Sequence, residues 1–271
     1  MNILFIGDIF GRPGRELVRR GLSPLVDRFD IDFVIANVEN AAGGFGITRE
    51  IGDAVAGYGV DVMTSGNHVW DKKEALDYVA AEPRLLRPAN YPSGVPGRGS
   101  ILARTAEGRG VGVLNLMGRV FMTPLDDPFA VALRELEAFA GRTRVIIVDF
   151  HAEATSEKIA MGWHLDGKVT AVIGTHTHVQ TADERLLPGG TAYLTDAGMT
   201  GPHDSIIGTE PEAALIRFRT GLPSRLEPAS GNPRLHGAVI GVDEATGLAT
   251  GIQRLDCSLE ELEAMRSSLS E

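Results

Sequence analysis

An α/β fold, in which central β-sheets are flanked by helices, is predicted by three features of this sequence. Short apolar runs alternate with segments of helical periodicity through the first half of the chain. These runs are hydrophobic at consecutive positions, which is typical of parallel strands covered by helices on both faces of a sheet. The later part adds strand patterns with fewer helices between them. We therefore expect an α/β sandwich, formed by a single domain that spans residues 1–271.

Strands are expected where a short apolar run is bounded by glycine or by polar turn residues. A proline- and glycine-rich segment, residues 87–100, separates the early strands from the later ones. The expected strands cover residues 2–7, 31–38, 60–66, 101–104, 111–116, 145–150, 170–174, 191–196, 236–243 and 250–256.

Helices are expected in the segments between these strands. Pro13 suits an early position of the first helix, Thr48 is a suitable cap for the second, and Asp71 favours a helix start. Ser258 and Glu261 form a capping-box pattern before a short terminal helix. Before this terminal helix, the expected helices cover residues 13–29, 48–59, 71–81, 130–141, 154–165 and 211–218.

Composition excludes several classes of protein. Hydrophobic residues make up 43% and charged residues 23% of the chain, the balance of a soluble globular protein. No apolar run approaches the roughly 20 residues that a membrane span needs, and residues 1–11 resemble a first strand rather than a signal peptide. Cys257 is the only cysteine, so a reducing cytoplasm is the expected location. The net charge of -10 argues against a stable nucleic-acid partner.

Polar side chains follow five of the expected strands, at the point where each strand ends. Ligands bind outside the carboxyl ends of strands in open α/β sheets, so these side chains are expected to share one site. The residues concerned are Asp8, Glu39 with Asn40, Asn67 with His68, His151, and the pair His176 and His178.

Each of these signals has an ordinary structural explanation. Asp8 and Asn67 suit turns, and Glu39 with Asn40 suits a helix cap. In extended backbone, residues i and i+2 point to the same side, so His176 and His178 are both expected to face the site. Unrelated turns would not be expected to place nitrogen and oxygen donors at the end of one strand after another. Together the residues predict a metal site.

The donor set exceeds what a single tetrahedral zinc ion needs. Two metal ions, roughly 3.5–4 Å apart, would use it with Glu39 as the bridging carboxylate. Iron, manganese and zinc all suit imidazole with carboxylate. Such a pair provides a hydroxide nucleophile and neutralises an incoming phosphate, which predicts phosphoester hydrolysis. His68 is the candidate donor of the proton that the departing alkoxide needs.

The stretches GDIFG, GNH and GTHTH, with the single His151 between the last two, resemble the signature blocks of calcineurin-like metallophosphoesterases. Longer stretches, among them GDIFGRPGRE, VENAAGGFGIT, SGNHVWDKKE and GTHTHVQTAD, resemble the YmdB-type family of 2′,3′-cyclic nucleotide 2′-phosphodiesterases. The resemblance runs from Met1 to about Asp243. It implies the calcineurin-like metallophosphoesterase fold, iron as the metal, and His68 as the proton donor.

The resemblance also implies how the ligands are divided between the metals. One metal takes Asp8, Glu39, Asn40 and His178. The second takes Glu39, Asn67, His151 and His176. The chain departs from the wider superfamily at Phe10, where the first block usually carries a histidine.

The expected function is therefore hydrolysis of small phosphodiesters, 2′,3′-cyclic nucleotides to 3′-nucleotides, through attack by a metal-bridging hydroxide. Two alternatives are a phosphomonoesterase or protein phosphatase that uses the same metals, and a nucleotide-sensing regulator whose metals hold a ligand. Assembly into a homo-oligomer is left open.

Around the site, Glu153 and Lys158 are candidate partners of the ligands or members of a helix cap, and Thr175 is expected to orient the histidine pair.

Overall fold

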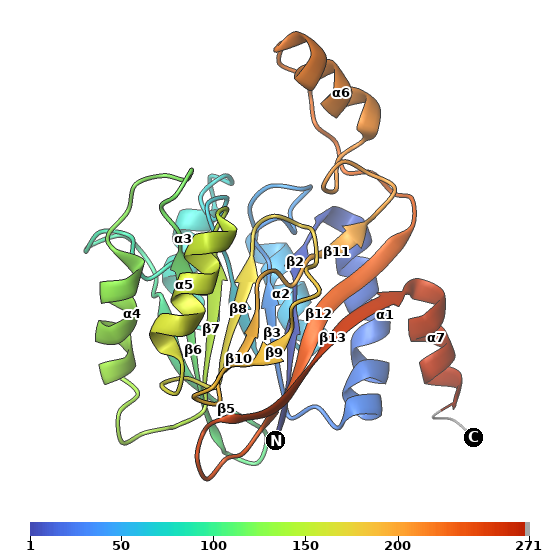
Figure 1. Cartoon of the computed structure of the whole chain (residues 1–271). Coiled ribbons are helices and arrows are strands. Elements are labelled where there is room, and N and C mark those ends of the chain that lie inside the picture. The colour runs from blue at the N-terminus through green and yellow to red at the C-terminus, as the bar shows by residue number, and fades with distance from the viewer. Residues whose placement is uncertain (269–271) are drawn as a thin grey trace.

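Two β-sheets form the centre of the molecule in the computed structural model, which describes residues 1–268 (Figure 1). Within those residues the first sheet has seven strands and the second has six. The first contains β1 (Asn2–Ile6), β2 (Asp8–Ile9), β3 (Phe33–Asn37), β4 (Val62–Thr64), β11 (Met199–Pro202), β12 (Pro233–Val242) and β13 (Ala249–Ser258). The second contains β5 (Ser100–Arg104), β6 (Gly110–Met117), β7 (Ile146–His151), β8 (Ala171–Thr175), β9 (Arg185–Leu186) and β10 (Ala192–Leu194).

Parallel pairing brings strand ends together at one edge of each sheet. The order of the first sheet is β2-β11-β12-β1-β3-β4, with β13 paired to β12, and β1, β3 and β4 run parallel. The order of the second is β5-β6-β7-β8-β10-β9, and β6, β7, β8 and β10 run parallel. His151 lies opposite Thr175 in the register of β7 and β8.

An apolar core lies between the sheets. Phe5 and Ile35 contribute to it from the first sheet, and Val113, Ile147 and Ile173 contribute from the second. All five side chains are fully buried. Because strands of both sheets are apolar on consecutive positions, each sheet can bury this inner face and still pack helices on its outer face.

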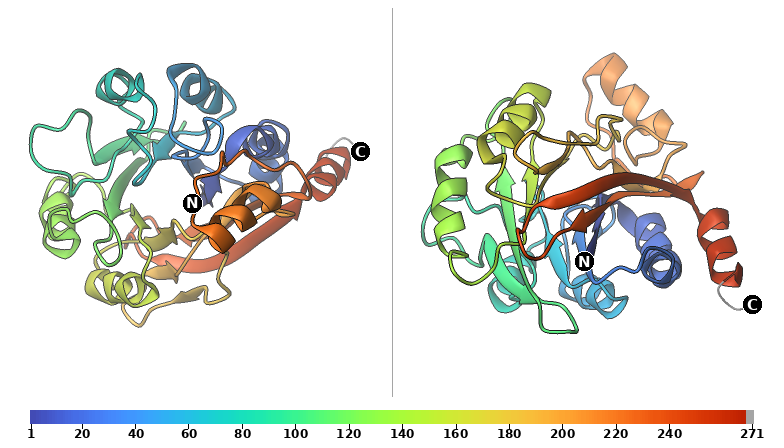
Figure 2. Two further views of the ribbon diagram at one scale, coloured as in Figure 1. Left: turned by 90° about the horizontal axis from the view of Figure 1, so that it is seen from above. Right: turned by 60° about the horizontal axis from the view of Figure 1, so that its bottom comes forward.

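Helices cover both outer faces. α1 (Gly11–Phe29), α2 (Arg49–Gly57) and α3 (Ala75–Ala81) pack on the first sheet, where α7 (Leu259–Ser268) lies beside α1. α4 (Pro128–Glu137) and α5 (Thr155–Leu165) pack on the second. α6 (Pro211–Thr220) projects from the end of the molecule at which the parallel strands finish (Figures 1 and 2). No helix within residues 1–268 is long and apolar enough to cross a membrane.

Local signals fixed several boundaries as expected. The Thr48 side chain accepts a hydrogen bond from the Ile51 amide, and Ser258 and Glu261 cap each other reciprocally. The expected helix start at Asp71 is wrong, because α3 begins only at Ala75 and residues before it form turns. The short strands β2, β9 and β11 were not expected, because two to four residues carry too little periodicity to be recognised.

Truncating the core between the sheets is expected to destabilise the fold. Ile147→Ala should lower the free energy of unfolding by about 2–5 kcal/mol, because it removes buried methyl groups and leaves a cavity. Urea unfolding with a chelator present measures this without a contribution from bound metal. Leu133→Ala, on the exposed side of α4, is the control and should change stability by less than about 1 kcal/mol. Equal effects of the two changes would contradict the assignment of this core.

Candidate metal centre

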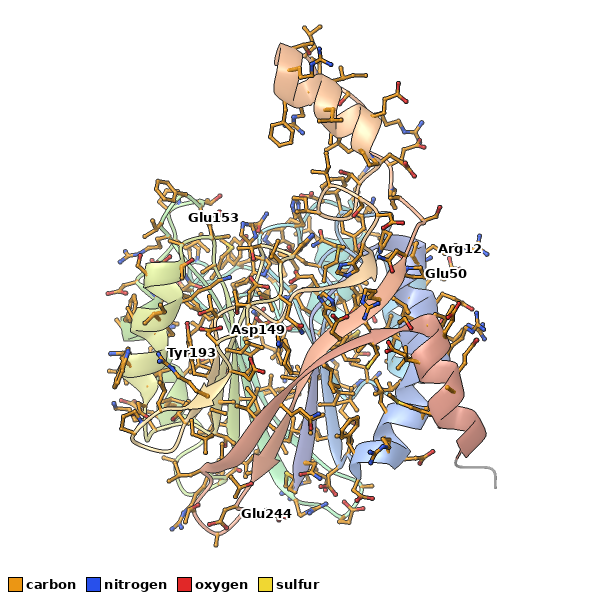
Figure 3. The ribbon with its side chains drawn as sticks, turned by 45° about the vertical axis from the view of Figure 1, so that its right-hand side comes forward. Arg12, Glu50, Asp149, Glu153, Tyr193 and Glu244 are labelled. Carbon is orange, nitrogen blue, oxygen red and sulfur yellow. The ribbon has the colours of Figure 1, made fainter. Side chains whose placement is uncertain are left out.

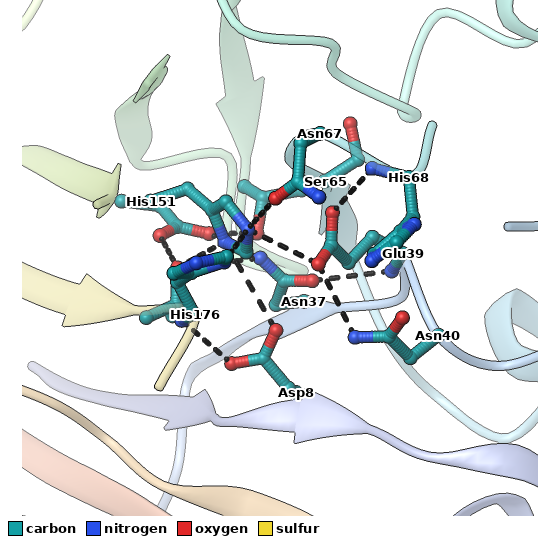
Figure 4. Close-up of polar contacts among 12 residues, drawn as sticks. Asp8, Asn37, Glu39, Asn40, Ser65, Asn67, His68, His151 and His176 are labelled. Carbon is teal, nitrogen blue, oxygen red and sulfur yellow. Dashed lines mark hydrogen bonds and ion pairs between the residues drawn. The ribbon is translucent and has the colours of Figure 1, made fainter. Parts of the chain in front are cut away.

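The seven expected ligands all lie at the edge where parallel strands of both sheets end. Those of the first sheet carry the oxygen ligands, and those of the second carry three imidazoles. Asp8 begins β2, Glu39 and Asn40 follow β3, Asn67 follows β4, His151 ends β7, and His176 and His178 follow β8. Figure 4 shows most of them converging on one point, and Figure 3 shows Glu153 at this end of the molecule and Glu244 at the opposite end.

One half of the cluster surrounds His151. Its Nε2 atom lies 3.0 Å from Asn67 Oδ1 and 3.1 Å from Glu39 Oε1. The same atom lies 3.1 Å from Nδ1 of His176. One ring nitrogen carries at most one proton and cannot satisfy three neighbours at once. Ligand atoms of Glu39, His151 and His176 all lie within 4.8 Å of one another, so this group could hold a metal ion.

The other half of the cluster surrounds Asp8. Its Oδ1 atom is buried and has no hydrogen-bond partner among residues 1–268. His178 Nε2 lies 3.9 Å from this oxygen and 3.1 Å from Asn40 Nδ2. Asn40 Nδ2 also donates to Glu39 Oε1 at 3.2 Å. An orphaned carboxylate oxygen facing an imidazole nitrogen fits a cation, although Asn40 would have to turn its amide to offer oxygen instead of nitrogen.

The buried groups of the cluster shift one another's pKa values. Burial raises the pKa of Asp8. Burial also acts to raise the pKa of Glu39, but His151 outweighs it and holds that pKa at about 2. Conversely, burial acts to lower the pKa of His151, and Glu39 raises it to about 9. His176 remains neutral, since burial and the neighbouring His151 lower its pKa to about 3.

Hydrogen bonds behind the cluster set the orientation of His151. Its Nδ1 atom lies 2.9 Å from Thr175 Oγ1, and that hydroxyl donates to Asp149 Oδ1 at 2.7 Å. Asn37 Nδ2 donates to the same carboxylate at 3.1 Å, and Thr64 Oγ1 donates to it as well. Burial raises the pKa of Asp149 to about 7. Thr175 was expected to orient the pair His176 and His178. Its hydroxyl instead contacts His151 and connects that ring to Asp149, a buried carboxyl group that sequence reasoning did not assign.

The backbone that carries the histidine pair differs from expectation. β8 ends at Thr175, and His176 and His178 have φ values of 104° and 65°. Both lie in the left-handed region rather than in extended backbone, so the argument from strand alternation is wrong even though both rings reach the cluster. Glu153 Oε2 lies 3.1 Å from His176 Nε2, which leaves Nδ1 turned to the cluster.

His68 lies at the rim of the cluster rather than within it. Its amide donates to Glu39 Oε2 at 3.0 Å, and its ring packs edge-on against Phe45 at 5.1 Å between centroids. Its Nδ1 atom lies 2.7 Å from Asp71 Oδ2. Asp71, expected to begin a helix, is instead the partner of His68. The spacing of three residues between His68 and Asp71 was the one sequence signal for this contact, but the same spacing occurs in both turns and helices.

A cavity of about 720 Å³ opens above the cluster. Glu39, Asn40, His68, His176 and His178 contribute to its floor and rim. Its walls are largely aromatic and aliphatic, from Phe10, Phe45, Ile207 and Phe218, and α6 also contributes Arg217. Phe10 packs against the His178 ring at 5.6 Å between centroids. The contribution of α6 to this site had no signal in the sequence.

Comparison with known proteins agrees with this architecture. A solved structure of a hypothetical protein from Thermus thermophilus is 43% identical, covers 95% of this chain and 99% of its own, and superposes with a TM-score of 0.89. A structure described as a novel phosphatase from Mycoplasma pneumoniae is 33% identical, with 95% and 93% of the two chains covered and the same TM-score of 0.89. The fold is that of the calcineurin-like metallophosphoesterases, as the resemblance implied.

Sequence comparison narrows this class to one family. The family model described as YmdB-like protein matches residues 4–255. A relative from Bacillus subtilis strain 168, named 2′,3′-cyclic-nucleotide 2′-phosphodiesterase, is 50% identical over 255 residues, which cover 94% of this chain and 96% of the relative. This chain therefore belongs to the YmdB-like family.

Removing the charge of Glu39 is expected to weaken metal binding. Glu39→Gln should reduce affinity for Mn²⁺ by at least about tenfold, because an amide replaces the carboxylate that both halves of the cluster share. Isothermal titration calorimetry of metal-free protein measures the change. Glu50→Gln, at the exposed start of α2, is the control and should bind as the wild type does. Unchanged affinity in Glu39→Gln would exclude Glu39 as a ligand.

Proposed function

We propose that this protein is a dinuclear metal-dependent phosphodiesterase that hydrolyses small phosphodiesters, with 2′,3′-cyclic nucleotides converted to 3′-nucleotides. The observation that carries the proposal is the convergence of Asn67, Glu39 and His176 on His151 Nε2 at 3.0–3.1 Å, beneath a cavity that Glu39 and His176 line. The name of the Bacillus subtilis relative supports the choice of substrate.

The donor set fits two metal ions. Asp8, Asn40 and His178 would hold one, Asn67, His151 and His176 would hold the other, and Glu39 would bridge them. Around this point the carboxylates of Asp8, Glu39 and Asp149 are all buried, and Asp8 Oδ1 has no hydrogen-bond partner among the described residues, an arrangement that calls for added positive charge. When bound, the metals supply the charge that activates water and neutralises the phosphate. Iron is the metal we propose, and manganese and zinc suit the same ligands.

His68 is proposed as the proton donor. Asp71 accepts from Nδ1 and so keeps a proton on that atom, which leaves Nε2 as the ring atom that can exchange a proton with substrate. When the bond between phosphorus and the 2′-oxygen breaks, protonated His68 donates from Nε2 to that oxygen, and the product carries a 2′-hydroxyl and a 3′-phosphate. The His68 ring packs against Phe45, and the His68 amide donates a hydrogen bond to Glu39. These two contacts hold the ring near the cluster.

The cavity supports a small substrate. Its volume of about 720 Å³ lies within the roughly 300–1,000 Å³ typical of small-molecule sites. Phe45 and Phe218 offer faces on which a nucleobase can stack, and Arg217 is the only lysine or arginine among the lining residues that the structure describes. The net charge of -10 works against long polyanions, so a mononucleotide suits this site better than RNA.

The substrate assignment predicts one product. Incubation of metal-replete protein with 2′,3′-cyclic AMP should release 3′-AMP, because the 2′-oxygen is the leaving group, and a chelator should abolish the reaction. Chromatography against 2′-AMP and 3′-AMP standards identifies the product.

Two results would redirect the assignment. Faster turnover of 3′-AMP or of a phosphopeptide than of the cyclic diester would favour a phosphatase. Absence of turnover on any phosphodiester, with both metals confirmed in the protein, would exclude the proposed activity and favour a nucleotide-sensing role.

Replacing the proton donor should lower the rate of the chemical step without loss of bound metal. His68→Ala is expected to lower kcat by about 10²–10⁴-fold, since general acid catalysis is worth that much. Metal content, measured by elemental analysis, should stay at the wild-type value. His164→Ala is a matched control, because that histidine lies outside the cluster and contacts the Phe129 carbonyl. If kcat falls only in proportion to metal content, His68 is not the donor.

A further inference from the structure

A buried ion pair lies directly behind the histidine loop, and nothing in the proposed chemistry uses it. Lys158 Nζ of α5 donates to Asp196 Oδ2 at 2.6 Å, just past β10. The two side chains are each 1% exposed. A buried pair of this kind often contributes little net stability, because desolvation offsets the attraction. Its contacts show a more specific role.

Asp196 binds the residue between the two histidines. The amide and the hydroxyl of Thr177 both donate to Asp196 Oδ2, at 3.1 Å and 2.8 Å. In the sequence THTH the histidine side chains reach the cluster while the threonine side chains turn back, Thr175 to Asp149 and Thr177 to Asp196. Because His176 and His178 both have positive φ, their backbone needs such external contacts to persist.

The same carboxylate also holds the strand that presents Asp8. Asp196 Oδ1 accepts from the Gly198 amide at 2.9 Å, and the Gly198 carbonyl accepts from the Asp8 amide at 3.1 Å. A Cβ atom on Gly7 would lie 2.2 Å from that carbonyl oxygen, so the two backbones are in direct contact. One buried carboxylate thus connects to the segments that carry three of the candidate ligands.

We propose that the Lys158–Asp196 pair is a positioning element for the metal centre. Asp196 holds the His176–His178 loop and the Asp8 strand at the spacing that the metals require, and Lys158 orients the carboxylate through its hydrogen bond to Oδ2. The inference rests on the proposed function, because it assumes that these residues bind metal. It assigns Lys158 to this loop, rather than to the helix cap or to direct contact with a ligand.

Thr177→Val tests the proposal with little change of shape. It removes one hydrogen bond to Asp196 and is expected to lower Mn²⁺ affinity by about tenfold, as loss of a group that orients a ligand does. Thr177→Ser keeps the hydroxyl and should bind as the wild type does. The measurements are calorimetric titration with Mn²⁺ and the urea midpoint of each metal-free variant.

Thr191→Val is the matched control. Thr191 is buried at the other end of β10, where its hydroxyl donates to Val169 O at 2.7 Å and accepts from the Gly167 amide at 3.0 Å. Thr191→Val should lower the urea midpoint of unfolding but leave the affinity for Mn²⁺ unaltered. Equal losses of affinity in Thr177→Val and Thr191→Val, or wild-type affinity in Thr177→Val, would overturn the positioning role.

Lys158→Met tests the other partner, and it should lower Mn²⁺ affinity by more than Thr177→Val does. Wild-type affinity in a folded Lys158→Met protein would remove Lys158 from the proposal. If that variant fails to fold, Thr177→Val decides alone. A wild-type protein that binds no Mn²⁺ would instead count against the metal centre itself, so failure of the proposed function is recognised before any variant is compared.

Discussion

The packing of the two sheets through one apolar core is the constraint on which the candidate site depends. The first sheet supplies Glu39 and the second supplies His151, and their ligand atoms lie 3.1 Å apart across the junction. A slip of one residue along a strand would move a ligand by about 3.3 Å, more than the whole of that separation. The fully buried residues between the sheets, such as Ile35 and Ile147, therefore set the geometry of the site as well as the stability of the fold.

Burial of charge is the second constraint, and it follows from the first. The packing of the two sheets buries the side chains of Asp8, Glu39, Asp149 and Asp196 almost completely. Each is stabilised differently: Glu39 by His151, Asp149 by two threonine hydroxyls, and Asp196 by Lys158. Asp8 retains one oxygen without a hydrogen-bond partner among the described residues. A site of this kind is suited to cations, since they supply the charge that side chains leave uncompensated.

Much of the fold, and the meeting of the candidate ligands at one edge of the sheets, was predictable from sequence, because the signals are local. Apolar runs mark the buried strands, Thr48 marks a helix start, and polar residues directly after strands mark the edge at which they meet. The predictions failed where side chains act over longer distances. Asp71 was expected to begin a helix and instead binds the His68 ring, and the histidine pair was expected in extended backbone but has positive φ. In each case a tertiary contact overrides a local preference.

By itself, the sequence determined the alternation of strands and helices, the polar residue types that follow the strands, and the family to which the chain belongs. Only the tertiary structure decided which ligand atoms converge, which cavity lies above them, and which buried groups hold them in place. The contact between Asn37 and Asp149 joins residues 112 positions apart, and that between Thr177 and Asp196 joins the loop after β8 to the segment after β10. Local patterns carry no information about such pairs, because their separation is set by how whole sheets and helices pack.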